Sequence, residues 1–367
     1  MKPQTVVELA QALIRIPSVN PDGETDGSET GEKACAEFVA AFCESFGGEA
    51  ALPEVLPGRP NVVVRFPSAA PRKSRILFAP HTDTVSVAGM TVAPFAAELR
   101  EGKIWGRGAS DTKGPMAAML WALHESRELL AELPHEIWFA GLMGEEAGLH
   151  GSKALAAETA FDFVIVGEPT GLRTVNCHKG QVRLTLATAG KACHASQPER
   201  GENAIYKMLD LAACVRDEIA PELERQTHPL LGHSTISLGT IRGGSKVNIV
   251  PDQCRAQVDI RLVPGFSADA AIRRLREVCP DVQIDASLSA PLQTSENHPL
   301  VQKLVEAGAP CTGAPWFCDA AAFAEKGVPA VAIGPGSIEQ AHTADEWIAV
   351  SDLEAGVDFF RRFLRSL

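Results

Sequence analysis

The chain has 367 residues, of which 45% are hydrophobic, so it is long enough for two domains and apolar enough to bury a sizeable core. Its net charge is −12 and it carries no basic run, which argues against nucleic acids and anionic membranes as partners. No uncharged apolar run approaches the roughly 18 residues that a membrane-spanning helix needs.

Nine cysteines are scattered without paired spacing, and no CxxC motif occurs. An odd number of isolated cysteines is more typical of reduced thiols than of a disulfide framework. The first residues lead into a helical pattern rather than a signal peptide. These features together predict a cytoplasmic protein.

Helices and a buried strand alternate at the start of the chain. Apolar residues recur at helical spacing in 5–15 and 32–46. The apolar run 76–80 predicts a buried strand that ends directly before His81. A predicted helix rich in Ala, Met and Leu follows from 114 to about 131.

Three further apolar runs predict buried strands, at 136–141, 161–167 and 329–334. Each is followed by carboxylate or imidazole side chains, which are Glu145 with Glu146, Glu168, and His342. Buried strands flanked by helices indicate an α/β fold with a mixed sheet covered by helices on both faces. Ligands bind at the C-terminal edge of the strands in such sheets.

The stretch 179–289 has a different pattern. Residues 182–189 and 254–262 alternate between apolar and polar, which predicts strands with one buried face. Helical patterns cover about 202–219 and 267–278. We therefore expect an α/β domain formed by residues 1–178 and 290–367. An α+β domain, residues 179–289, is inserted into it.

Five short motifs supply ligands suited to metal ions. They read His81-Thr82-Asp83, Ser110-Asp111-Thr112-Lys113-Gly114, Gly144-Glu145-Glu146, Gly167-Glu168-Pro169 and Ala341-His342-Thr343. Two histidines and three carboxylates suffice for two zinc ions that share one carboxylate. Such a pair lowers the pKa of water and supplies hydroxide near neutral pH. Asp83 and Glu145 remain, to orient a ligand and to act as a base. Each motif alone also fits a turn, a loop hydrogen bond or a helix cap; their number and order favour a two-metal hydrolase.

The order of these motifs resembles the metallopeptidase and amidohydrolase family that includes acetylornithine deacetylase, succinyl-diaminopimelate desuccinylase and the aminoacylases. The resemblance covers nearly the whole chain and implies a zinc-dependent exopeptidase-like catalytic domain. It implies two Zn²⁺, with Co²⁺ or Mn²⁺ able to use the same ligands. By this resemblance His81, Asp111 and Glu168 bind one ion, and Asp111, Glu146 and His342 bind the other. It also makes Glu145 the general base and Asp83 the residue that orients His81, and it implies a cis peptide bond after Asp111.

The insert resembles the lid or dimerisation domain of that family, which implies a homodimer. Residues 190–196 are similar to a segment whose histidine, here His194, stabilises the oxyanion in the partner's active site. Asn248 and Arg261 lie in segments that resemble substrate-contacting parts of the lid. Arg261 would form a bidentate pair with a substrate carboxylate. The alternatives are a surface loop histidine for His194 and an ordinary salt bridge for Arg261.

The loop 334–342 resembles the acetylornithine deacetylase form, which favours a small-molecule N-acyl amino acid such as N-acetylornithine as the substrate and acetyl as the group removed. Trp316 and Phe317 differ from the small residues that many relatives carry before Asp319. A desuccinylase, a dipeptidase or carboxypeptidase with the same site, and a non-catalytic scaffold protein remain as alternatives.

Overall fold

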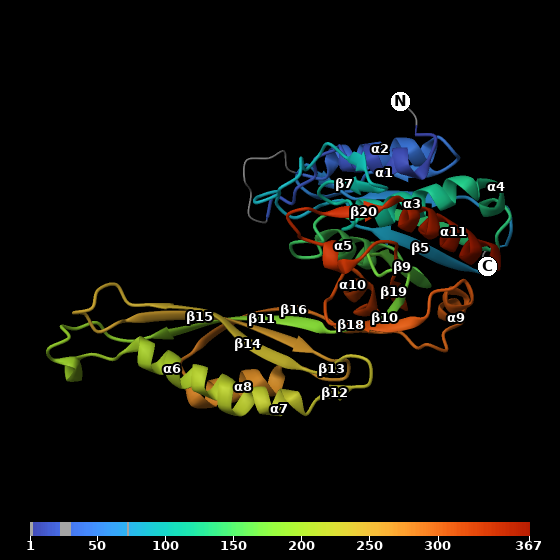
Figure 1. Cartoon of the computed structure of the whole chain (residues 1–367). Coiled ribbons are helices and arrows are strands. Elements are labelled where there is room, and N and C mark those ends of the chain that lie inside the picture. The colour runs from blue at the N-terminus through green and yellow to red at the C-terminus, as the bar shows by residue number, and fades with distance from the viewer. Residues whose placement is uncertain (1–2, 23–30, 72) are drawn as a thin grey trace. The chain divides into compact units, whose positions relative to one another are not determined.

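The computed structural model describes residues 3–22, 31–71 and 73–367, and the chain forms two compact units (Figure 1). The first comprises residues up to Asn176, Thr294–Thr312 and Cys318–Leu367. The second comprises Cys177–Gln293 and Gly313–Phe317. The short segment Gly313–Phe317 lies with the second unit, a placement that the sequence pattern did not predict. The roles expected for the two domains stay predictions.

The first unit is built on a mixed sheet, as predicted, and this sheet has nine strands. In spatial order these are β1 (Glu49–Ala51), β4 (Val62–Phe66), β8 (His135–Gly141), β5 (Ser74–Pro80), β9 (Phe163–Gly167), β19 (Ala330–Ala332), β10 (Thr174–His178) and β17 (Leu292–Gln293), with β18 (Cys311–Ala314) paired to β10. Strand β5 is parallel to both β8 and β9, and β9 is parallel to β19. Along β10, β17 and β18 the chain passes from one unit to the other.

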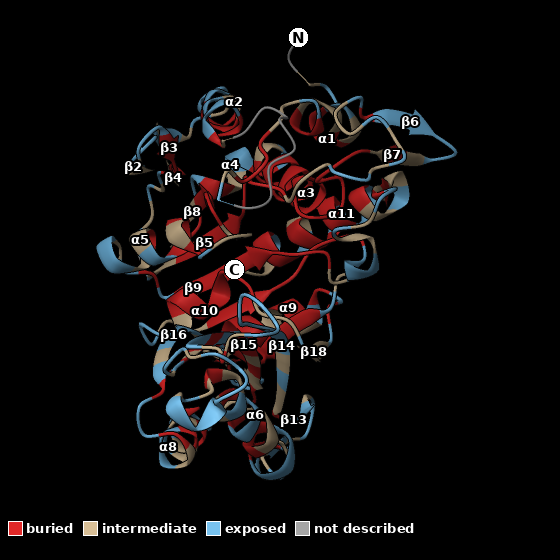
Figure 2. Ribbon diagram, turned by 90° about the vertical axis from the view of Figure 1, so that its left-hand side faces the viewer, coloured by how far each residue is buried: buried red, intermediate tan, exposed pale blue. Residues whose placement is uncertain are grey.

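The central strands are buried on both faces, which explains their uninterrupted apolar sequences (Figure 2). Side chains alternate between the two faces of a strand. Ile76, Phe78 and Ile165 therefore join the main core, where Phe78 packs edge-on against Phe360. On the other side, α10 (Ala320–Ala324) contacts β9 and β19 and packs against α5 (His150–Glu158).

The helices on the main-core face are α1 (Val6–Ile14), α2 (Lys33–Glu44), α3 (Lys113–Glu125), α9 (Pro299–Glu306) and α11 (Val350–Ser366). The first three confirm the predicted helices, although the third ends at Ser126 and a short helix, α4 (Arg127–Leu130), continues its path. Gly114 allows close packing at the start of α3, because a Cβ there would lie 2.3 Å from the carbonyl oxygen of Ala109.

Smaller elements complete the first unit. They are β2 (Glu54–Leu56) with β3 (Arg59–Pro60), a three-stranded sheet of β20 (Trp347–Ala349), β7 (Lys103–Trp105) and β6 (Glu98–Arg100), and the 3₁₀ turn η3 (Ile338–Gln340).

The second unit is an antiparallel four-stranded sheet with helices on one face. The strand order is β14 (Thr235–Gly243), β15 (Gln253–Leu262), β11 (Gly180–Ala189) and β16 (Gln283–Ser289). Alternate residues such as Leu184 and Val258 pack in one core with Met208 and Leu275 of the helices, which confirms the predicted one-sided burial. The helices are α6 (Ala204–Cys214), which continues through the π-helical turn η2 (Val215–Ile219) into α7 (Ala220–Glu224), and α8 (Asp269–Val278). A hairpin of β12 (Thr227–His228) and β13 (Gly232–His233) and the 3₁₀ turn η1 (Pro198–Arg200) complete it.

Within residues 3–22, 31–71 and 73–367, each helix is too short or too polar to cross a membrane. The structure describes all nine cysteines, and none of them forms a disulfide bond.

Candidate metal centre

The five candidate ligands converge at the C-terminal edge of the parallel strands. His81 follows β5 and Glu168 follows β9, and because these strands are parallel and adjacent, both residues emerge at one edge. Glu146 comes from the loop after β8, and His342 from the loop after β19. Asp111 precedes α3, and its peptide bond to Thr112 is cis, as the family resemblance implied.

These side chains form two groups of three that share Asp111. Ligand atoms of His81, Asp111 and Glu168 all lie within 4.8 Å of one another, and those of Asp111, Glu146 and His342 do so as well. The two oxygens of Asp111 face different histidines. Nε2 of His81 is 3.0 Å from Oδ1, and Nε2 of His342 is 3.3 Å from Oδ2. A carboxylate shared in this way can bridge two cations.

Charge and burial make this site suitable for cations. Oε1 of Glu168 is buried and has no hydrogen-bond partner among the residues that the structure describes. Burial, followed by the nearby Asp111 carboxylate, raises the pKa of both Glu168 and Glu146. Burial would also raise the pKa of Asp111, but hydrogen bonds with His342 and His81 lower it below its ordinary value. Imidazole nitrogens and clustered carboxylates that repel one another fit a pair of divalent cations, Zn²⁺ in particular.

The ring of His81 is held in place by Asp83. Its Nδ1 lies 2.9 Å from the backbone carbonyl of Asp83 and 3.5 Å from that residue's carboxylate. Since a carbonyl only accepts, Nδ1 donates a proton to it, and Nε2 is the nitrogen that faces Asp111 and would bind a metal. Both the backbone carbonyl and the carboxylate of Asp83 therefore face Nδ1 of His81, and the backbone contact is the shorter of the two.

The Asp83 carboxylate also anchors the loop after β8. Its two oxygens accept the backbone N–H groups of Glu145, at 3.1 Å, and Glu146, at 3.0 Å. Nδ2 of Asn20 donates to the same carboxylate at 2.7 Å. Asn20 was not predicted as a site residue, because an asparagine far from every motif gives no local signal.

Glu145 is half-buried beside the ligands and belongs to neither group of three. Burial raises its pKa well above the ordinary value, and His81 only partly offsets this, while the Glu168 and Asp319 carboxylates raise it further. A carboxylate whose pKa lies closer to neutrality is suited to accept a proton and then to release it. Asp319, which sequence reasoning left without a role, is fully buried in the same neighbourhood, and burial raises its pKa to about 7.

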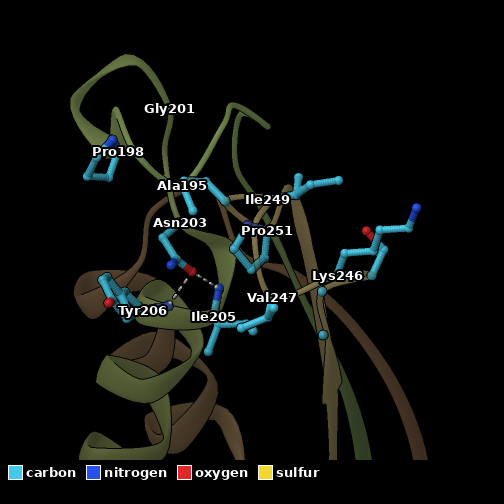
Figure 3. Close-up of a pocket in the computed structure, with 14 residues that line it drawn as sticks. Ala195, Pro198, Gly201, Asn203, Ile205, Tyr206, Lys246, Val247, Ile249 and Pro251 are labelled. Carbon is cyan, nitrogen blue, oxygen red and sulfur yellow. Dashed lines mark hydrogen bonds between the residues drawn. The ribbon is translucent and has the colours of Figure 1, made fainter.

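In the second unit, His194 and Asn248 lie side by side. His194 forms a bridge with Ile249, and the N–H of Ala195 donates to the carbonyl of Asn248 at 3.0 Å. The exposed ring of His194 accepts the N–H of Ser196 at Nδ1, at 3.2 Å, so its proton resides on Nε2. The two segments border a groove of about 850 Å³, shown in Figure 3. Its lining includes Ala195, Asn203, Tyr206, Val247, Ile249 and Pro251.

Arg261 lies at the opposite end of the same sheet. Gln253, at the His194 end of β15, is eight residues away, which corresponds to about 26 Å at about 3.3 Å per residue. Nε of Arg261 donates to Asp259 at 2.7 Å, the salt bridge that the sequence left open as an alternative. Its guanidinium also lies 5.8 Å from the ring centre of Phe317. One copy of this unit therefore holds His194 and Arg261 too far apart to contact one small substrate.

Curated relatives are similar to this chain over almost its full length. An acetylornithine deacetylase from Proteus mirabilis (strain HI4320) is 29% identical, with 96% of this chain and 94% of the relative covered. The acetylornithine deacetylase of Aliivibrio salmonicida (strain LFI1238) is 28% identical, with 99% of each chain covered.

Solved structures share the fold. A tripeptidase from Staphylococcus aureus superposes with a TM-score of 0.80 at 21% identity, covering 99% of this chain and 98% of that one. A metallo-carboxypeptidase from Sulfolobus solfataricus gives a TM-score of 0.79 at 20% identity, covering 99% of each. The family model described as peptidase family M20/M25/M40 matches residues 77–366, a range that holds all five candidate ligands. The resemblance carried by the motifs is thus confirmed, and the chain belongs to peptidase family M20/M25/M40.

Proposed function

We propose that this protein is a metal-dependent amidohydrolase that removes the acetyl group from an N-acetyl amino acid such as N-acetylornithine. The observation that carries the proposal is the pair of three-residue ligand groups sharing Asp111, with Glu145 beside them. Relatives named acetylornithine deacetylase that match over almost their full length support the substrate class. A Bacillus subtilis relative of the same fold is described as a dinuclear metal-binding peptidase.

His81, Asp111, Glu146, Glu168 and His342 would hold two cations, with Zn²⁺ first and Co²⁺ or Mn²⁺ as substitutes. When bound, the cations polarise the scissile carbonyl and lower the pKa of a water molecule. Glu145 takes a proton from that water and delivers it to the leaving nitrogen, for which its raised pKa is suited. Asp83 holds the backbone of Glu145 in place for both transfers.

The protein acts as a homodimer in this proposal, with the second unit as its lid and dimerisation domain. A lone subunit separates His194 from Arg261 by the length of β15, so both can serve one active site only if His194 comes from a second copy. The proton on Nε2 of His194 makes the ring a hydrogen-bond donor for the developing oxyanion. Nine cysteines without a disulfide bond among them fit a cytoplasmic location.

We expect His194→Ala to lower kcat by about 10²–10³-fold with little change in metal content, because one oxyanion donor is lost. Steady-state kinetics on metal-loaded protein measures this fall in kcat. Mixing His194→Ala subunits with Glu145→Gln subunits should restore about a quarter of wild-type activity, since half of randomly mixed dimers then have one intact site. An unchanged kcat, or no recovery on mixing, would contradict action in the partner's site.

The decisive test is amine release from a substrate panel, measured on metal-stripped protein with and without added Zn²⁺. The panel contains N-acetylornithine, other N-acetyl amino acids, N-succinyl-diaminopimelate and simple dipeptides. Zn²⁺-dependent cleavage of an N-acetyl amino acid is the expected result. Cleavage of only the succinyl compound or the dipeptides would overturn the acetyl assignment in favour of a desuccinylase or a dipeptidase. No cleavage by protein with two bound cations would overturn the acetyl assignment and would indicate either an acyl group outside the panel or a scaffold.

A further inference from the structure

We propose that Glu346 is a positioning residue that fixes the bridging Asp111 against the loop of His342, and so sets the spacing of the two ligand groups. This inference rests on the proposed function. Glu346 lies four residues after His342, on the same loop, and its side chain is completely buried. It is not among the candidate ligands.

All four of its strong contacts reach the segment that delivers Asp111. Oε1 accepts the backbone N–H groups of Ser110, at 2.8 Å, and of Asp111 itself, at 2.9 Å. Oε2 accepts the N–H of Gly108 and a guanidinium N–H of Arg107, both at 2.9 Å. Because an ionised carboxylate offers about four acceptor sites, this one is fully used.

Arg107 extends the same network to two other ligand loops. Its Nη1 donates to the carbonyl of Thr343, next to His342, at 3.2 Å, and its Nε donates to the carbonyl of Ser86 at 3.1 Å. Ser86 lies in the segment that follows His81 and Asp83. The buried pair of Arg107 and Glu346 thus ties together the loops that carry three of the five candidate ligands.

Residues 108, 110 and 111 lie outside every helix and strand, so their backbone N–H groups need acceptors elsewhere. The carboxylate of Glu346 provides these acceptors to the segment before α3. A buried N–H without an acceptor is strongly unfavourable, so the segment takes the path that brings all three to Glu346. The position of Asp111 relative to His342 follows from that path. A glutamine at 346 would keep the volume but lose one acceptor oxygen, and its amide would face N–H donors.

The experiment compares wild-type protein with Glu346→Gln, and uses Asp345→Asn as the matched control. Asp345 is exposed on the same loop, so its replacement removes the same charge without touching the buried network. Metal-stripped proteins are titrated with Co²⁺ against a competing chelator, and their visible Co²⁺ spectra are recorded with kcat and KM. We expect Glu346→Gln to bind Co²⁺ about 10–100-fold more weakly, with an altered spectrum and lowered kcat at similar KM. The control should match wild type.

Wild-type Co²⁺ affinity and spectrum in folded Glu346→Gln would overturn the inference, even if its thermal stability falls. If that variant does not fold, Arg107→Lys tests the same network, because lysine keeps the charge but cannot reach Glu346, Thr343 and Ser86 together. An unaltered Co²⁺ spectrum in this variant would count against the inference too. Wild-type protein that binds no Co²⁺ would instead refute the proposed function itself, and the inference with it.

Discussion

We expect Glu145→Gln to lower kcat by up to about 10⁴-fold while both cations stay bound, because glutamine has almost the same size but cannot accept a proton. Metal content should not change, since Glu145 belongs to neither group of ligands. KM should change little, because the proton transfers occur after the substrate has bound.

The measurement is kcat on protein whose metal content has been determined, over a range of pH. Wild-type activity should rise with pH as Glu145 loses its proton, because only the ionised carboxylate can act as the base. Glu145→Gln should lose that rise. Glu158→Gln, the same chemical change at an exposed position of α5, serves as the control. A wild-type rate would exclude Glu145 as the base, and loss of a cation would make it a ligand instead.

The sheet and the candidate ligands were predictable because their signals are local. Strands β5 and β9 are short apolar runs that end directly before a ligand, as in Phe163–Gly167 followed by Glu168. Five motifs in one order are also specific enough to indicate the family, which the family model then shows over 77–366. Parallel pairing of β5 and β9 was the only tertiary step required to bring His81 near Glu168.

The supporting residues were not predictable, because their roles exist only in the folded chain. Glu346 follows another acidic residue, Asp345, and its sequence context indicates a solvated turn. In the structure it is buried and accepts N–H groups from a segment more than 230 residues away in sequence. Asn20 likewise meets Asp83 only through the packing of distant segments. The contact of Phe317 with Arg261 depends on the return of residues 313–317 to the second unit.

Removing the cations should abolish activity and destabilise the protein, and the loss of stability should grow between pH 5 and pH 8. Without cations, the carboxylates of Glu145, Glu146, Glu168 and Asp319 are buried close together, and the pKa of each is raised. Asp319 shows the direction in which stability changes with pH. Its folded-state pKa is about 7, against about 3.9 in an unfolded chain, so it stabilises the fold below pH 4 and that contribution is lost as the pH rises through 7.

His342, Asp83 and Asp111 do not reverse this loss of stability with rising pH. His342 has its pKa raised to about 10 by Asp111 and Glu146, so its contribution is also lost as the pH rises above its ordinary value. Asp83 and Asp111 have lowered pKa values, despite burial, through their hydrogen bonds with the histidines. Their contributions are lost only below about pH 4 and are therefore constant between pH 5 and pH 8.

Bound cations cancel the repulsion, and their affinity rises with pH as the ligands lose protons. At about 100 times Kd for each of two independent sites, binding stabilises the fold by about 5 kcal/mol, which corresponds to a rise in Tm on the order of 10 °C. Thermal unfolding of stripped and Zn²⁺-loaded protein from pH 5 to pH 8 measures this. Asp319→Asn should flatten the pH dependence of the stripped protein, because it removes one buried acid. If Tm of the stripped protein stays constant or rises over this range, the carboxylates of the site do not repel one another, and the electrostatic case for a cation pair fails.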